Sequence, residues 1–266
     1  MRVVRILLTV TSILTGAAIA HAQTPTQTPA PLPGEAVPFS RIDFTFGWSA
    51  IASTDPRFDW RSALGIDVDL VDYQLGRVTF AADYEGTLGG ERRTFDLNQG
   101  SYSFDTGVLQ RIGHGVEAGG FVSHLSRHVV DRENPASVSS NLMGGRLAFQ
   151  SDRDLKHVRG VVEGGFFIQQ AFVDYRATVR GRVHFAYGIT PRTDAFVAGR
   201  GEMIWVDPEI ADRSTLIGVR AEGGVRVNGH VAAIEIFAAY DDRVDAYPTD
   251  RERRRWIEFG ARIVGR

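Results

Sequence analysis

The segment from Tyr175 to Tyr187 constrains the fold more than any other part of the chain. Side chains on a β-strand alternate between two faces. Here one face carries Tyr, Ala, Val, Gly, Val, Phe and Tyr, and the other carries Arg, Thr, Arg, Arg, His and Ala. A strand of this length, at about 3.3 Å per residue and a tilt of roughly 45°, rises about 30 Å, which matches the hydrocarbon core of a bilayer. The pattern predicts a membrane-spanning barrel strand with a tyrosine at each interface.

The N-terminal residues predict export. Arg2 and Arg5 precede a mostly apolar run over residues 6–20, and residues 20–22 (Ala-His-Ala) have the small-x-small pattern of a cleavage site. We therefore expect residues 1–22 to be a cleaved signal peptide. The run is shorter than the roughly 18 apolar residues that a spanning helix needs, and no later segment approaches that length. The expected destinations are the periplasm, the medium or an outer membrane.

Composition and the segment before the first strand narrow the classes of function. The chain has no cysteine, so disulfides, iron–sulfur clusters and thiolate metal sites are excluded. The formal net charge of -2 gives no reason to expect a nucleic-acid partner. Residues 23–40 hold five prolines among Thr, Gln and Ala, which predicts an extended periplasmic linker. Residues 41–266 are left for the folded part.

From residue 41 onward, apolar and polar residues alternate in segment after segment, with turn residues between them. Counting these segments predicts about twelve strands, an even number, as in bacterial outer-membrane barrels. The connections alternate in length, which places long loops on one rim and short turns on the other. Together these patterns predict an all-β, antiparallel, up-and-down transmembrane barrel in a bacterial outer membrane. The long connections are expected at 51–61, 86–100, 129–138 and 241–255, and the short ones at 72–76, 111–115 and 151–155.

A soluble β-sandwich would also alternate, but its strands are usually nearer 5 or 6 residues. Many segments here reach ten residues or more, which favours the barrel. A barrel of this kind is expected to contact outer-membrane lipid and the outer-membrane assembly machinery. The chain ends Ile263-Val264-Gly265-Arg266, without the terminal aromatic residue that such barrels typically carry. The sequence does not indicate an oligomeric state.

The residues predicted to face the barrel interior are sorted by charge. Those in the first five strands are mainly acidic, and those in strands six to ten are mainly arginine. In a closed barrel the two arcs face each other across the lumen, where buried charges must be paired or hydrated. Two outcomes stay open: a salt-bridge network that plugs the barrel, or a narrow pore for ions or solutes. The arcs consist of Asp67, Asp69, Asp83 and Glu85 on the acidic side, and of Arg146, Arg159, Arg176, Arg180, Arg182, Arg200 and Arg220 on the other.

One polar group on the predicted lipid-facing side suggests catalysis. The alternation places His124, Ser126 and His128 outward at the upper end of one strand. If the following hairpin is symmetric about residues 132–133, His124 lies opposite Asn141 on the next strand. Such a group suits nucleophilic acyl transfer, in which His124 takes the proton of Ser126 and Asn141 orients the imidazole.

The residues His124-Leu125-Ser126 resemble the His-x-Ser motif of the outer membrane phospholipase A and lipid A deacylase families. Those barrels carry the motif near the extracellular end of a strand and hydrolyse acyl chains of outer-leaflet lipids. The resemblance implies a lipid acyl hydrolase, with Asn141 as the counterpart of the phospholipase asparagine and with calcium as a possible cofactor; otherwise no cofactor is expected. Arg127-His128 replaces the Asn-Gly that follows the phospholipase serine, and the Ser-to-Asn spacing is longer here.

Other interpretations of the same residues stay open. The three outward side chains can be polar caps where a strand meets the membrane interface. A metal site formed by His124, His128 and Asp131 is disfavoured, because histidines four residues apart on a strand lie about 13 Å apart. The sequence therefore predicts an outer-membrane barrel that is structural or a narrow pore, with a Ser/His lipid hydrolase as the alternative.

Overall fold

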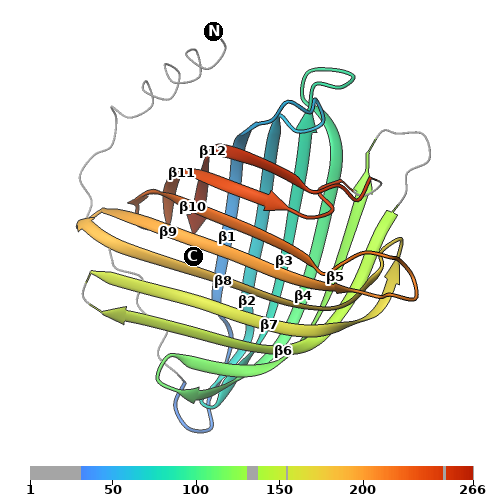
Figure 1. The fold of residues 1–266 in the computed structure, drawn as a ribbon. Coiled ribbons are helices and arrows are strands. Elements are labelled where there is room, and N and C mark those ends of the chain that lie inside the picture. Colours follow the sequence, from blue (N-terminus) through green and yellow to red (C-terminus); the bar gives the residue numbers. More distant parts are fainter. Residues whose placement is uncertain (1–30, 131–136, 154, 248–249, 266) are drawn as a thin grey trace.

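The computed structural model describes residues 31–130, 137–153, 155–247 and 250–265, and these form one closed barrel of twelve antiparallel strands (Figure 1). The predicted fold class is therefore confirmed. The predicted signal peptide (1–22) and the first part of the predicted linker lie outside the described residues. Among the described residues, no helix is long and apolar enough to cross a membrane. The strands are β1 (Ala36–Ala52), β2 (Trp60–Tyr73), β3 (Gly76–Gly89), β4 (Asp96–Gly113), β5 (Val116–Val129), β6 (Ser137–Arg153), β7 (Lys156–Ala171), β8 (Tyr175–Thr190), β9 (Thr193–Val206), β10 (Leu216–Asn228), β11 (Ala232–Arg243) and β12 (Arg254–Gly265).

Each strand pairs with its neighbour in the chain, and the barrel closes where β1 pairs with β12. At this closure Trp48 lies opposite Ala261, and Phe44 lies opposite Gly265. Consecutive strands joined by hairpins can only be antiparallel, which produces the up-and-down order that the sequence predicts. Closure also leaves no strand edge unpaired, as a barrel in lipid requires.

The connections alternate in length around the barrel, as the sequence predicts. Strand β1 starts at the rim of the short turns, and strand β12 ends at the same rim. In outer-membrane barrels this is the periplasmic side. The connections at the long-loop rim are 53–59, 90–95, 130–136, 172–174, 207–215 and 244–253, and those at the other rim are 74–75, 114–115, 154–155, 191–192 and 229–231. The connections 172–174 and 229–231 have the same length.

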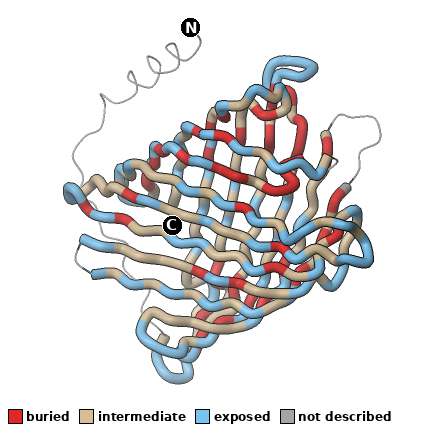
Figure 2. Tube along the Cα trace, viewed as in Figure 1, coloured by how far each residue is buried: buried red, intermediate tan, exposed pale blue. Residues whose placement is uncertain are grey.

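The outer wall of the barrel is apolar. Exposed residues alternate with half-buried or buried ones along the strands (Figure 2). The exposed large apolar residues are mostly Val, Ile, Leu and Phe. Aromatic residues gather on this face towards the long-loop rim, including Trp48, Tyr102, Trp205 and Tyr240. An apolar band bordered by aromatic residues is the surface that a bilayer solvates.

Two local features differ from the expected alternation. The register shifts between Tyr175 and Ala177, and the Tyr175 hydroxyl donates to Asp245 at 2.5 Å. Tyr175 therefore points towards the loops and the lumen and is not a girdle residue, whereas Tyr187 at the other end of β8 is exposed. A bulge adds a residue to one strand and reverses the phase beyond it. Strand β1 begins at Ala36, inside the expected linker, with a shift between Pro38 and Arg41.

Candidate functional site

The upper end of β5 presents His124, Ser126 and His128 on the outer wall. The exposures of two neighbouring residues show which face of β5 is outward: Phe121 is 3% exposed and Val122 is 49% exposed. Even-numbered residues of β5 therefore point outward and odd-numbered residues point into the barrel. The alternation along this strand is the one that the sequence predicts.

The register between strands shows which residues of β4 and β6 lie beside the β5 residues. His124 lies directly opposite Asn141 on β6, as expected for a symmetric hairpin. Ser126 lies opposite Tyr102 on β4 and opposite Ser139 on β6. Directly opposite residues on one face have Cβ atoms about 5 Å apart, within reach of a side-chain hydrogen bond.

The His124 imidazole is oriented by Asn141. The distance from His124 Nδ1 to Asn141 Oδ1 is 2.7 Å. Because an amide oxygen only accepts, Nδ1 carries the proton in this contact, and Nε2 of the neutral ring is left as the basic nitrogen. Asn141 Nδ2 in turn donates to Gln169 Oε1 on β7 at 2.9 Å, which aims the amide oxygen at the histidine.

The Ser126 hydroxyl lies against a different histidine. The distance from Ser126 Oγ to His128 Nε2 is 2.7 Å, and no hydrogen bond joins Ser126 to His124 among the described residues. The residues expected to form one triad are thus present on one face as two hydrogen-bonded pairs. The alternation along a strand predicts the face on which a side chain lies. The rotamer of the serine then decides whether its hydroxyl contacts the residue two positions before it or the residue two positions after it.

Aromatic rings surround both histidines. Phe104 stacks on His124 with ring centroids 6.5 Å apart, and Tyr102 meets His128 edge-on at 6.0 Å. Tyr84 packs against Tyr102 at 5.0 Å. Tyrosine is enriched at the boundary between hydrocarbon and headgroups of membrane barrels, and two tyrosines lie beside this group.

On the inward side of the same segment of β5, a side chain bonds to a loop across the barrel mouth. Arg127, between Ser126 and His128, donates to the backbone carbonyls of Asp245 and Ala246 at 2.7 and 2.8 Å. These carbonyls belong to the connection between β11 and β12, on the far side of the barrel mouth. Such a tether reduces the freedom of the backbone that carries the site, which preorganises its side chains.

The surroundings of Ser126 bear on the expected calcium only through the side chains that the structure describes there. No group of three or more His, Asp or Glu side chains among them is placed to hold a metal ion. Asp131, the carboxylate nearest in sequence, lies outside the described residues. The side chains next to Ser126 on the outer face are hydroxyl, amide, imidazole and aromatic groups. Calcium takes oxygen ligands, which include carboxylates, carbonyl oxygens and water. A dependence on calcium stays a prediction.

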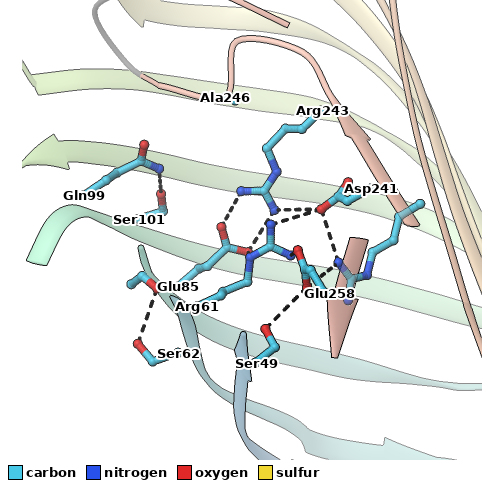
Figure 3. A network of polar contacts seen from close by, with 12 residues as sticks. Ser49, Arg61, Ser62, Glu85, Gln99, Ser101, Asp241, Arg243, Ala246 and Glu258 are labelled. Atoms are coloured by element: carbon cyan, nitrogen blue, oxygen red, sulfur yellow. Dashed lines mark hydrogen bonds and ion pairs between the residues drawn. The ribbon is translucent and has the colours of Figure 1, made fainter. Parts of the chain in front are cut away.

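The lumen contains an ion network, shown in Figure 3, that the sequence predicts only in part. Arg61 of β2 reaches Glu258 at 2.7 Å and Asp241 at 3.1 Å. Arg220 bonds to the same two carboxylates, and Arg243 of β11 crosses to Glu85 of β3 at 3.0 Å. Glu258 and Asp241 are 0% and 1% exposed, so their charges depend on these arginines. We call this group the central network: Arg61, Glu85, Arg220, Asp241, Arg243 and Glu258.

Four members of the two predicted arcs bond to residues on adjacent strands. On the acidic side, Arg41 bonds to Asp67 and to Asp69 at 2.8 and 3.1 Å. On the arginine side, Arg146 and Arg180 share Glu163, at 2.6 and 2.5 Å. Of the remaining arc members, Asp83 lies on β3, Arg159 on β7, Arg176 and Arg182 on β8, and Arg200 on β9, 4.0 Å from Asp241.

Several lumen residues were not singled out from the sequence. Arg41 and Arg61 place positive charge within the acidic arc, and Asp241 and Glu258 bring carboxylates from the last two strands. The same alternation, followed along β1, β2, β11 and β12, would have placed them inward. Gln169 was also missed, because the register shift between β6 and β7 at Asn141 hides its alignment.

Loop residues cover the lumen at the long-loop rim. Phe58 is 1% exposed. It stacks on Trp256 with ring centroids 5.2 Å apart and meets Tyr247 edge-on at 6.3 Å. Asp245 holds the same region through Tyr175 and through Arg213, whose Nη2 donates to it at 2.8 Å. Below these contacts, a cavity of about 170 Å³ borders the central network and is lined by Arg61, Glu85, Arg200, Arg220, Phe237 and Arg262, among others.

Comparison with known proteins supports the fold. No family model matches the chain, and no curated protein sequence matches it. Outer membrane phospholipase A from Escherichia coli is 9% identical, with a TM-score of 0.54 over 86% of this chain and 98% of that chain. The outer membrane phospholipase dimer from Salmonella typhi, with bound calcium, is 10% identical, with a TM-score of 0.53 over 88% and 93%. At such identity the likeness shows the fold alone, and that fold is the bacterial outer-membrane β-barrel.

Proposed function

We propose that this chain is an outer-membrane lipid acyl hydrolase, with Ser126 as the nucleophile, His124 as the general base and Asn141 as the residue that orients the base. The hydrogen bond between His124 Nδ1 and Asn141 Oδ1, on the outer wall two residues from Ser126, carries the proposal. An outward imidazole that an amide holds in one tautomer is what a base for serine requires. A polar cap at the interface would not need this relay.

Residence in the outer membrane is part of the proposal. The apolar outer wall, its aromatic border and the asymmetric loops support it, as does the fold shared with outer-membrane barrels. With short turns towards the periplasm, the Ser126 group faces the outer leaflet.

The chemistry follows from the two hydrogen-bonded pairs. The Ser126 side chain turns from His128 to the free Nε2 of His124 by rotation about its Cα–Cβ bond, between staggered positions that are both common on strands. His124 takes the hydroxyl proton as Oγ attacks the ester carbonyl carbon. The alcohol leaves, an acyl-serine remains, and water releases the fatty acid in a second step.

The same proposal takes the lumen as closed to solutes. The buried carboxylates of the central network each contact more than one arginine, and aromatic loop residues pack above them. These contacts support a filled barrel whose rigidity serves the outer wall, in preference to a pore.

Turnover of lipids by the purified, refolded barrel tests the function. In mixed micelles of phospholipid and lipid A, with and without calcium, we expect fatty-acid release that falls by at least about 10³-fold in Ser126→Ala and in His124→Ala. Ser123→Ala is the matched control, because Ser123 lies on the same strand but points inward and is 9% exposed. Heat-modifiability on gels checks that each variant is folded. Undiminished release by Ser126→Ala, or no release from any lipid by the unmodified barrel, would refute the function.

A further inference from the structure

His128 Nε2 lies 2.7 Å from the Ser126 hydroxyl oxygen. A triad with one histidine does not use this imidazole, so its position needs its own explanation. We propose that His128 is a second catalytic residue, which protonates the departing alcohol and then activates the water that frees Ser126. This inference rests on the proposed lipid hydrolysis.

The direction of β5 gives the two histidines different surroundings. The strand runs from the short-turn rim at Val116 to the long-loop rim at Val129. His128 is therefore nearer the headgroups than Ser126 by about 7 Å along the strand, and His124 is nearer the membrane centre by the same distance. Phe104 stacks on His124, consistent with an apolar environment on that side.

A bound lipid ester is oriented by the same axis. Its acyl chain points to the membrane centre and its alcohol points to the headgroups and water. With the carbonyl carbon at Ser126, the leaving oxygen is on the side of His128, and the hydrolytic water arrives from that side. The proton that His124 takes from Ser126 lies on the other side of the ester bond from the leaving alcohol. An acid at the rim, such as His128, has a shorter path for a proton to the alcohol oxygen.

Over one turnover, every proton that is transferred has a named donor and a named acceptor. In acylation the bond from Ser126 Oγ to the acyl carbon forms and the ester C–O bond breaks; the serine proton goes to His124, and protonated His128 gives its proton to the alcohol. In deacylation a water oxygen bonds to the acyl carbon and the bond to Ser126 Oγ breaks. The water proton then goes to His128, and His124 returns its proton to Oγ. Both histidines regain their starting states, and the fatty acid leaves.

Two esters of the same fatty acid distinguish this role from others. A phospholipid has an alcohol that must be protonated as it leaves, whereas a p-nitrophenyl ester releases a phenolate that needs no acid. For His128→Gln, which keeps a hydrogen-bonding side chain beside Ser126, we expect phospholipid hydrolysis to fall by about 10²–10³-fold. With the nitrophenyl ester the same variant should release about one phenolate per barrel and then stall as the acyl-serine, detected by intact mass.

Matched variants make each outcome informative. His124→Gln should show no burst with either ester, because it lacks the base for the first step. Wild-type rates for His128→Gln with both esters would overturn the second-residue role and return His128 to an interfacial cap. Equal loss with both esters and no burst would also overturn it, because His128 would then only position Ser126. Failure of the hydrolase function itself is read separately, from the unmodified barrel and from Ser126→Ala.

Discussion

A side chain on the wall of a barrel can contact the residues two positions away on its own strand and the residues directly opposite on the neighbouring strands. The Ser126 site contains a contact of each kind. Ser126 reaches His128 along β5, and His124 reaches Asn141 across to β6. The sequence was sufficient to place His124 opposite Asn141, because the hairpin is symmetric and the period of two is unbroken on β5. It could not assign the partner of the serine hydroxyl, because both i ± 2 neighbours are histidines on the same face.

At the residue scale, Asn141→Leu keeps the volume of the side chain and removes the acceptor that holds His124. Because the imidazole then loses its fixed tautomer and orientation, we expect kcat for fatty-acid release to fall by about 10–100-fold with little change in KM. Gln169→Ala removes only the donor behind Asn141, and its effect should be smaller. Equal activity of Asn141→Leu and the unmodified barrel would contradict the proposed orienting role of Asn141.

At the scale of elements, the long connections are ordered by ion pairs as well as by aromatic packing. In the loop 53–59, Arg57 donates to Asp55 at 2.7 Å and to Asp250 of the β11–β12 connection at 2.9 Å. The hydrogen bond from Arg57 holds the pKa of Asp55 below its ordinary value, although partial burial opposes this shift. The alternation of the strands contains no information about such contacts, so the sequence predicted where the loops lie but not how they pack.

Because of this pair, we expect the packing of the loop 53–59 to weaken in acid. A carboxyl group with a lowered folded-state pKa stabilises the fold above its ordinary pKa of about 4, and that contribution is lost as the pH falls through the folded-state value. We expect the loop 53–59 to resist an acid-active protease at pH 5 and to be cut faster at about pH 3. Asp55→Asn should be cut at rates that change less with pH. The exposed Asp212, replaced by Asn, is the control, and identical pH profiles for all three proteins would contradict the assigned role of Asp55.

At the scale of the whole molecule, the period of two and the alternating loops were enough to predict twelve strands and their order. The partners of the lumen charges were not predictable, because contacts such as Arg243 to Glu85 depend on strand tilt and stagger around the closed wall. The sequence therefore left a plugged lumen and a pore as alternatives. The long-range pairs of the central network and the aromatic packing at the rim support the proposal of a plugged lumen.

A closed lumen predicts that the refolded barrel carries no current in planar bilayers beyond that of the bare membrane, since paired buried charges leave no continuous water path. Current steps would contradict the closed lumen. If their anion/cation preference changes in Arg180→Glu with Arg182→Glu, but not in the lipid-facing Val179→Thr, the steps arise from the lumen.

The central claim is that Ser126 is a nucleophile on the outer wall, and covalent labelling tests it most directly. The folded barrel in lipid is treated with an alkyl fluorophosphonate, and the modified residue is mapped by mass spectrometry of its peptides. We expect one label per chain, on Ser126, lost in Ser126→Ala and strongly slowed in His124→Ala. A barrel that stays unlabelled, or a label that persists on another residue in Ser126→Ala, would contradict the account.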